Sequence, residues 1–381
     1  MTLRNVLVVV AVLTVSVAVM LAGCARSGEG TAMADGSRIS GPFTHDNLAV
    51  FLIHGPDKIQ GKTYLTLQEA MEAKKVVVAE TCNVNELTIE NVSNEDVYIQ
   101  SGDIVKGGRQ DRTIQNDLVC PAKSGKMPLA AFCVEHGRWS GRGNEAASQF
   151  GSSAMNLSSK ALKVAAKGAN DQSAVWAEVS NAQGKMSTNA GRSVASTQSA
   201  SSLQLSLEDK GVQEAIGAYQ SELAGIVDKK ADVIGYAFAI NGKLNSVDVY
   251  ASHSLFIKMW PKNLRASSVE AFAEYKKDAK FEPLKAQAVE VCLADAAKGK
   301  QSTQKLTERV QLVTRESKDN LQYETIDAKA AAPAHMNIIT RDSETERVLQ
   351  NRAMPANGQP NAPVPQQAPR QQNNESNQPS H

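Results

Sequence analysis

The first half of the chain contains six short runs that are rich in β-branched and apolar residues. Gly, Asn, Asp, Ser or Pro separates them, as turn formers separate strands. The runs are residues 47–54, 76–81, 86–92, 97–100, 118–120 and 129–134. Their density predicts a β-rich N-terminal half, sandwich or barrel-like. One helix is expected among them, over residues 67–74, because Thr66 and Glu69 form a capping-box pattern.

The second half is predicted to combine amphipathic helices with a β-hairpin. Apolar residues recur at helical spacing in residues 171–184 and 208–227. Asn241-Gly242 lies between two apolar runs, and both residues tolerate the positive φ of a tight hairpin turn. Together with the strand-rich first half, this pattern predicts an α+β fold.

The N-terminus has the pattern of an exported lipoprotein. Arg4 precedes the apolar residues 6–21, a run too short to span a bilayer comfortably, and small residues follow it. Leu-Ala-Gly-Cys, residues 21–24, resembles the bacterial lipoprotein box, in which the cysteine thiol receives a diacylglycerol and cleavage falls before it. Residues 1–23 are therefore predicted to be a signal peptide and Cys24 the lipidation site. A plain signal peptide or an N-terminal anchor helix is the alternative.

Lipidation at Cys24 would determine where the protein is located. Several acyl chains hold a protein durably on a bilayer, since each buried methylene contributes about 0.8 kcal/mol. The predicted location is the bacterial cell envelope, with the membrane as a partner through the lipid. Ala25 follows the cysteine instead of Asp, which favours the periplasmic side of the outer membrane in a bacterium with two membranes.

Charge and cysteine content bound the class of protein. The chain has 41 Lys and Arg against 40 Asp and Glu, a formal net charge of +1, so nothing favours nucleic-acid binding. Besides Cys24 there are four cysteines, Cys82, Cys120, Cys133 and Cys292. An oxidising envelope permits disulfides, but a chain of this length also buries free thiols, and both readings stay open.

The composition divides the chain into five segments. Residues 1–23 are the signal peptide, and residues 24–43 are small and polar, as in a flexible tether. The main globular domain is expected over residues 44–278, with a C-terminal extension over 279–329. Residues 330–381 are rich in Pro, Gln, Asn and Ser, which predicts a disordered tail that could reach an envelope or wall partner.

The stretch QSGDIVKGGRQDRT, residues 100–113, is the first candidate site. Adjacent Gly107 and Gly108 would let backbone amides approach an anion, and Arg109 and Arg112 would offer bidentate donors to a phosphate or carboxylate. The other candidates of this stretch are Gly102, Asp103, Gln110 and Asp111. No Walker or GxGxxG pattern is present. The alternative is a bulged turn with surface ion pairs that contribute little.

The stretch FCVEHGRW, residues 132–139, is the second candidate. Glu135 is the candidate proton acceptor, Arg138 a candidate anion clamp and Trp139 a candidate rim residue. Cysteines near His136 invite a zinc site, but their spacing matches no zinc motif, so no metal and no other cofactor is predicted. No nucleophile elbow or catalytic triad is visible, which leaves open whether the protein is an enzyme.

Three blocks of the chain carry a resemblance to a known family. QSGDIVKGGRQDRT, FCVEHGRW and GYAFAINGKLNSVDVYASHSLFIKMWP resemble, in order and spacing, the ADP-ribosylglycohydrolase- and rhodanese-phosphatase-associated protein domain family. The likeness covers residues 44–277. It implies that the first two blocks share one site, and at most a link to ADP-ribose, NAD or phosphorylated ligands, with no catalytic role assigned. His136 stands where Gln is expected in many relatives, which argues against an indispensable imidazole.

Two hypotheses about function follow. In the first, the envelope protein binds an anionic small molecule, phosphorylated or nucleotide-like, through Arg112 and Arg138, with Glu135 as the acceptor. In the second, it is a structural or interaction lipoprotein, and the same residues form a buried ion-pair network. An accessible concavity at these residues would favour the first, whereas charges sealed against Asp103 and Asp111 would favour the second.

Overall fold

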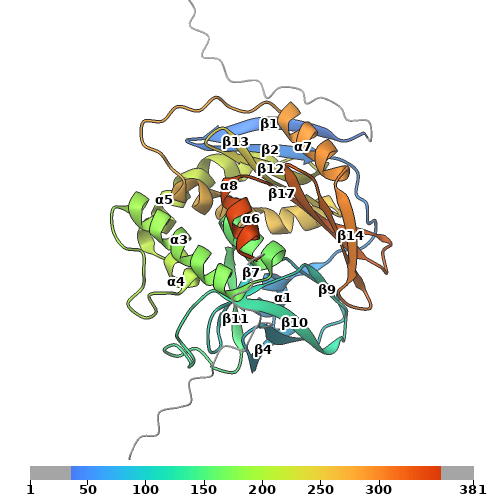
Figure 1. Ribbon diagram of the computed structural model, residues 1–381. Coiled ribbons are helices and arrows are strands. Elements are labelled where there is room, and N and C mark those ends of the chain that lie inside the picture. The colour runs from blue at the N-terminus through green and yellow to red at the C-terminus, as the bar shows by residue number, and fades with distance from the viewer. Residues whose placement is uncertain (1–35, 353–381) are drawn as a thin grey trace, which may run out of the picture.

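The computed structural model describes residues 36–352 of the 381-residue chain (Figure 1). The strands are β1 Arg38–His45, β2 Leu48–His54, β3 Leu65–Thr66, β4 Val76–Asn83, β5 Glu86–Asn91, β6 Val97–Ile99, β7 Asp103–Gly107, β8 Arg112–Ile114, β9 Leu118–Cys120, β10 Gly125–Cys133, β11 Phe150–Asn156, β12 Val233–Ile240, β13 Lys243–Tyr250, β14 Lys300–Lys305, β15 Val310–Glu316, β16 Asn320–Asp327 and β17 Ala332–Thr340. The helices are α1 Leu67–Glu72, α2 Lys160–Lys163, the π-helix η1 Val164–Ala169, α3 Gln172–Ala190, α4 Leu203–Leu207, α5 Lys210–Leu223, the 3-10 helix η2 Ala224–Val227, α6 His253–Ala273, α7 Gln287–Ala297 and α8 Ser343–Arg352.

An eight-stranded antiparallel sheet forms the upper part of the molecule in Figure 1. Its strand order is β1-β2-β12-β13-β17-β16-β15-β14. Asn241 and Gly242, with φ of 54° and 72°, turn β12 into β13, so the predicted hairpin is confirmed. Strand β17 lies in the interior of the sheet, between β13 and β16, although it comes last in the sequence.

The strand-rich first half builds two smaller sheets. One has six strands in the order β11-β7-β8-β10-β5-β4, and the other has the order β3-β6-β9. All six predicted runs are strands, and Thr66 is the N-cap of α1, with both bonds of the capping box formed. The predicted α+β class with a strand-rich N-terminal half is confirmed.

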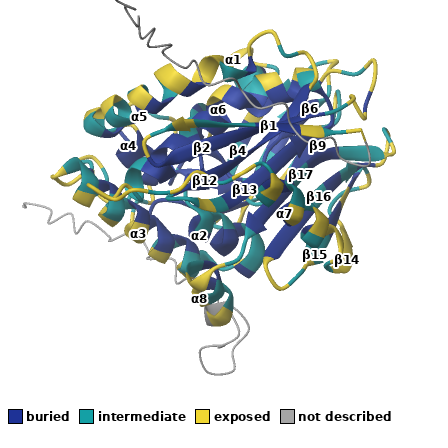
Figure 2. Ribbon diagram, turned by 90° about the horizontal axis from the view of Figure 1, so that it is seen from above, coloured by how far each residue is buried: buried dark blue, intermediate teal, exposed yellow. Residues whose placement is uncertain are grey.

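The main hydrophobic core joins the large sheet to the strand-rich half. Val50 and Phe238 of the large sheet share this core with Ile89 and Leu129 of the six-stranded sheet and with Trp260 of α6. Figure 2 shows the strands buried at the centre and the exposed residues on the outer helices and loops. Helix α7 covers the other face of the large sheet. None of the described helices is long and apolar enough to cross a membrane.

Two segment boundaries differ from the prediction. Strand β1 begins at Arg38, inside the predicted tether, and β17 and α8 lie inside the segment predicted to be disordered. That prediction is wrong for residues 332–352, because the polar average of the whole segment hid one apolar run. Ala334, Ile338 and Ile339 of that run are fully buried. The predicted signal peptide, Cys24 and residues 353–381 lie outside the described residues.

The four cysteines of the described residues are free thiols. Cys82 is exposed, and Cys120, Cys133 and Cys292 are buried. Burial raises the pKa of Cys133 to about 11 and that of Cys292 to about 12. Of the two alternatives for these residues, the structure therefore has free thiols rather than disulfides.

Candidate functional site

The two predicted blocks lie side by side, as the resemblance implied, but they meet in a closed ion-pair network. Asp111 and Glu135 are fully buried and face the guanidinium groups of Arg138 and Arg142. We call these four residues the sealed cluster. Arg142 binds Asp111 through two nitrogens, at 2.8 and 3.1 Å.

Every charged group of the sealed cluster has partners within the protein. Arg138 donates to both oxygens of Glu135 at 2.7 Å and to the carbonyls of Gly107 and Gly108. Burial alone would raise the pKa of Glu135, but hydrogen bonds from Arg138, Ser199 and the Asp111 amide lower it below its ordinary value. A carboxylate held in this way has neither the raised pKa nor the free lone pairs of a general base.

The glycines of the first block serve close packing. Glycine is required at position 108 because a Cβ there would lie 2.3 Å from the Phe150 ring, and at position 102 because one would lie 2.2 Å from Asn156 Oδ1. The amides expected to hold an anion are already used. Gly107 N–H donates to Asp111, and Gly108 N–H donates to backbone carbonyls. An anion-binding nest is therefore not formed here.

The remaining predicted site residues are also engaged internally. Asp103 accepts from Lys262 Nζ at 2.8 Å in a buried pair, and the Gln110 side-chain amide donates to the Glu135 carbonyl. Arg112 is fully buried beside Glu80, with Nη2 3.5 Å from its carboxylate. Its Nη1 donates to the Gln110 carbonyl at 2.7 Å, but Nε and Nη2 have no hydrogen-bond partner within the described residues. The guanidinium groups of Arg109 and Arg112 lie over the half-exposed Trp139 ring. At these residues, the structure has the geometry of the second hypothesis.

A different set of ionisable groups surrounds a pocket at the centre of the molecule. We call it the central pocket. It lies where the eight-stranded sheet, the three-stranded sheet, α6 and the π-helix η1 meet. Its charged lining residues are Asp117, Lys163, Lys167, Asp248 and His335.

His335 of β17 is the centre of a buried ion-pair triad. Its two carboxylate partners are Asp248 of β13 and Asp117 of the turn before β9. Its Nδ1 lies 2.7 Å from Asp117 Oδ2 and its Nε2 lies 3.1 Å from Asp248 Oδ1. Burial alone would lower the pKa of His335, but the two carboxylates raise it above its ordinary value. Since both ring nitrogens are bonded to carboxylates, the imidazolium acts as a fixed positive charge and not as a free base or nucleophile.

Two lysines bring further positive charge to the central pocket. Lys163 ends α2 and Lys167 lies in η1, four residues on, so both reach the pocket from one face. Within residues 36–352 neither ammonium group donates a hydrogen bond. Lys167 Nζ is 3.9 Å from Asp117 Oδ1, its side chain only 4% exposed, and Lys163 Nζ lies over the Phe238 ring. Single π-helical turns occur frequently at functional sites.

Neutral polar groups complete the lining. Gln100 accepts from the Tyr250 hydroxyl at 2.6 Å and donates to Asn263 at 3.1 Å. Tyr250 in turn stacks on the His335 ring, with centroids 4.4 Å apart. Gln100 and Ser101, which also line the pocket, are the first residues of the predicted glycine stretch. That stretch therefore begins at the central pocket and ends at the sealed cluster.

The size of the central pocket limits what it can hold. About 30 Å³ of it is deep enough for water-sized molecules. One water needs roughly 10–15 Å³ on this measure, so there is room for two or three waters or for an anionic group of a few atoms. A nucleotide would have to remain largely outside. Among the described residues, no three His, Cys, Asp or Glu side chains are grouped so as to hold a metal ion.

The comparison with family models matches residues 36–338 to the ARG and Rhodanese-Phosphatase-superfamily-associated Protein domain. The chain belongs to this family. The family domain runs further than the resemblance over residues 44–277 and extends into β17, so it includes His335. No curated protein and no solved structure matches the chain.

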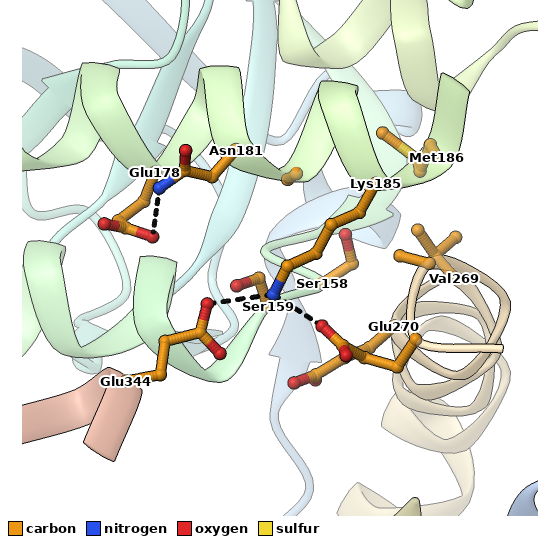
Figure 3. Close-up of a pocket in the computed structure, with 12 residues that line it drawn as sticks. Ser158, Ser159, Glu178, Asn181, Lys185, Met186, Val269, Glu270 and Glu344 are labelled. Carbon is orange, nitrogen blue, oxygen red and sulfur yellow. Dashed lines mark hydrogen bonds and ion pairs between the residues drawn. The ribbon is translucent and has the colours of Figure 1, made fainter. Parts of the chain in front are cut away.

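A second pocket is smaller than the central pocket, and the lysine that lines it is already paired with carboxylates. It lies between α3, α6 and α8, and its deep space is about 10 Å³, enough for one water. Figure 3 shows Lys185 reaching across it, and the ammonium pairs with Glu274 at 2.6 Å and Glu344 at 2.9 Å. Its ammonium group is therefore hydrogen-bonded to two carboxylates, whereas Lys167 of the central pocket has one longer ion pair, 3.9 Å to Asp117.

Sequence reasoning missed the charged residues of the central pocket. They come from five separate elements. Only Asp248 lies in a block singled out in the sequence, the third block of the resemblance, and that block was used there only for its hairpin. Asp117 precedes the three-residue strand β9, and His335 fell in the segment predicted to be disordered. The only local signal was the spacing of Lys163 and Lys167, which places two cations on one helical face.

Proposed function

We propose that this chain is a lipid-anchored protein of the bacterial cell envelope whose family domain binds a small anion in the central pocket. The anchor rests on the lipoprotein box that ends at Cys24. The binding site proposed here replaces the predicted one at Arg112, Glu135 and Arg138, whose charges are paired internally.

The observation that carries the binding proposal is that the ammonium groups of Lys163 and Lys167 line the central pocket without donating a hydrogen bond within the described residues. Lys167 has one long ion pair, 3.9 Å to Asp117, and each ammonium lies over an aromatic ring. Their N–H donors therefore remain available to water or to a ligand. With the imidazolium of His335, the pocket has three cations against the two carboxylates of Asp117 and Asp248. The positive excess and the two ammonium groups that donate no hydrogen bond within the described residues favour an anionic ligand, such as a phosphate or carboxylate group.

The family description agrees in kind with a phosphorylated ligand. Its words record an association with the rhodanese-phosphatase superfamily, and the pocket has the size of one phosphate or carboxylate group. A larger phosphorylated molecule would place only its charged end inside. This would suit the terminal group of a sugar phosphate better than an entire dinucleotide.

Thermal melting of the full chain in detergent tests the binding proposal. Orthophosphate, a sugar phosphate and acetate are added separately, each at constant ionic strength. A ligand at about 100 times its Kd adds about 2.7 kcal/mol of stability, which raises Tm by several degrees. Lys163→Gln should lose the rise, and Lys210→Gln should keep it because that lysine is exposed on α5.

The alternative function is a structural or interaction lipoprotein. The sealed cluster favours it, since four charged residues there only hold loops together. No stabilisation by any anion, or equal stabilisation of wild type and Lys163→Gln, would leave this alternative standing. A partner bound by residues 353–381 belongs to this alternative. The anchor itself is tested by the mass of the N-terminal peptide, which should carry acyl chains in wild type and none in Cys24→Ser.

A further inference from the structure

The central pocket offers a hydrogen-bond acceptor as well as donors, and this narrows the class of ligand. We propose that the ligand carries a hydroxyl donor next to its anionic oxygens, as a hydrogen phosphate or a small hydroxy acid does. The inference rests on the proposed function, because it concerns the same pocket. It adds a requirement that the positive charge alone does not impose.

The acceptor is the carboxylate of Asp248. Its Oδ1 accepts two hydrogen bonds, from His335 Nε2 at 3.1 Å and from Asn337 Nδ2 at 2.9 Å. The antiparallel register of β13 and β17 fixes this arrangement, since Asp248 lies opposite Asn337. Oδ2 takes neither of these bonds. Burial and then the charge of Asp248 raise the pKa of Tyr236, so the Tyr236 hydroxyl lies near this carboxylate. Because a carboxylate oxygen has two lone pairs, Oδ2 keeps at least one for a ligand even where Tyr236 donates to it.

A second carboxylate could not take this role. In Asp117, Oδ1 accepts from the Ser101 amide and lies near Lys167, and Oδ2 accepts from His335 and Thr325. The lone pair that remains on Oδ1 faces the Lys167 ammonium, 3.9 Å away, so a ligand hydroxyl could reach it only by displacing that cation. Asp248 is therefore the residue of the pocket that can tell one anion from another.

The consequence is a difference between anions of the same size. Sulfate and acetate present only acceptor oxygens, so one of them must face Asp248 Oδ2 with a like charge and no proton between. Hydrogen phosphate and glycolate can donate an O–H to Oδ2 while their other oxygens accept from Lys163 and Lys167. A hydrogen bond to a charged group contributes about 1.5–3 kcal/mol, which corresponds to at least about tenfold in affinity.

Calorimetric titration of the full chain with two matched pairs tests the inference. The pairs are orthophosphate against sulfate and glycolate against acetate, at pH 7 and equal ionic strength. We expect the member with the hydroxyl to bind at least about tenfold more tightly in one pair. Discrimination only in the first pair identifies a phosphate ligand, and discrimination only in the second identifies a hydroxy acid. Both support the inference.

Equal affinities within both pairs would overturn the inference and leave the proposed function intact. Binding of none of the four anions would overturn both. Asp248→Asn should reduce the ratio within the discriminating pair towards one, because the amide can donate to the second anion. Lys163→Gln should weaken both members and keep their ratio, and Lys210→Gln should change neither. Should Asp248→Asn fail to fold, the wild-type ratios alone still decide.

Discussion

His335 places a positive charge between the buried carboxylates of Asp117 and Asp248 at the central pocket. It is 2% exposed and lies between two buried carboxylates. A buried carboxylate without its cation is strongly destabilising, so the three groups depend on one another. Thr325 of β16 and Asn337 of β17 also bond these carboxylates. The ion-pair triad of His335, Asp117 and Asp248 therefore joins the large sheet to the three-stranded sheet.

We expect His335→Gln to lower the free energy of unfolding by about 3–5 kcal/mol at pH 6, since two carboxylates lose their buried cation. The folded pKa of His335 is raised, above an unfolded value of about 6.5. Its stabilising contribution is thus complete below that value and is lost as pH rises through the folded pKa. The difference in the free energy of unfolding between wild type and His335→Gln should become smaller in alkaline solution.

Urea unfolding at pH 6 and pH 9.5 measures this difference. His253→Gln is the control, because that ring bonds the Val233 carbonyl, and its loss should cost about 1 kcal/mol. A difference for His335→Gln that stays the same at both pH values would contradict the assigned charge.

Alanine substitutions at Gly108 and Gly143 distinguish the cost of backbone strain from the cost of steric overlap. Both have positive φ, 55° and 57°, but a Cβ meets the Phe150 ring only at position 108 and nothing within 4 Å at position 143. We expect Gly143→Ala to cost about 1 kcal/mol through strain, and Gly108→Ala about 1–3 kcal/mol more through overpacking. Equal losses in chemical denaturation would show that the Phe150 ring moves aside at little cost.

At the scale of elements, the sealed cluster holds two long connections against the sheet. Arg142 belongs to the loop between β10 and β11, and Ser202, the N-cap of α4, donates to Asp111 at 2.7 Å. Arg138 closes the same loop onto Glu135. Polar loops without strands of their own are fixed in this way by charges that are buried and paired.

We expect Arg142→Met to cost about 3–5 kcal/mol, because the buried Asp111 loses its bidentate partner. Arg192 offers a matched control. It also binds an aspartate, Asp209, through two nitrogens, at 2.7 and 2.9 Å, but its side chain is 50% exposed. Arg192→Met should change the unfolding midpoint little, since water screens an exposed pair. Equal losses for the two variants in guanidinium unfolding would contradict a sealed cluster.

Local elements could be predicted from the sequence, but the strands that pair with them in the sheets could not. The Asn241-Gly242 hairpin and the capping box of α1 follow from residues a few positions apart, and both are present. Strands β7 and β8 were missed because the glycine stretch was taken for a loop, although every residue of β8 is buried. Their burial depends on β10 and β11, which pair with them from further along the chain.

At the scale of the whole molecule, the last described segment closes the fold. Strand β17 bonds both β13 and β16, and α8 packs against η1, the π-helix of the central pocket. A chain that ends at Lys329 would split the large sheet between β13 and β16, which would each lose one of their two neighbouring strands, and it would lack His335. We expect it to be unfolded, with no cooperative transition in thermal melting.

A chain that ends at Arg352 is the control for this truncation, because it keeps every described contact. Its Tm should equal that of the full chain. A cooperative transition in the shorter chain would show that β17 adds to a sheet that is already stable without it.

Turn chemistry, capping and apolar alternation act over a few residues, so the local elements and the α+β class could be predicted from the sequence, and three sequence blocks indicated the family. The sequence also brought the glycine stretch and Glu135–containing block together through the resemblance. Which charged groups are fully hydrogen-bonded became visible only in the folded chain. A charge finds its partners only after distant strands have met, so Arg138 donates to Glu135 and to two backbone carbonyls, while Lys163 and Lys167 donate no hydrogen bond within the described residues. The candidate site follows from that difference.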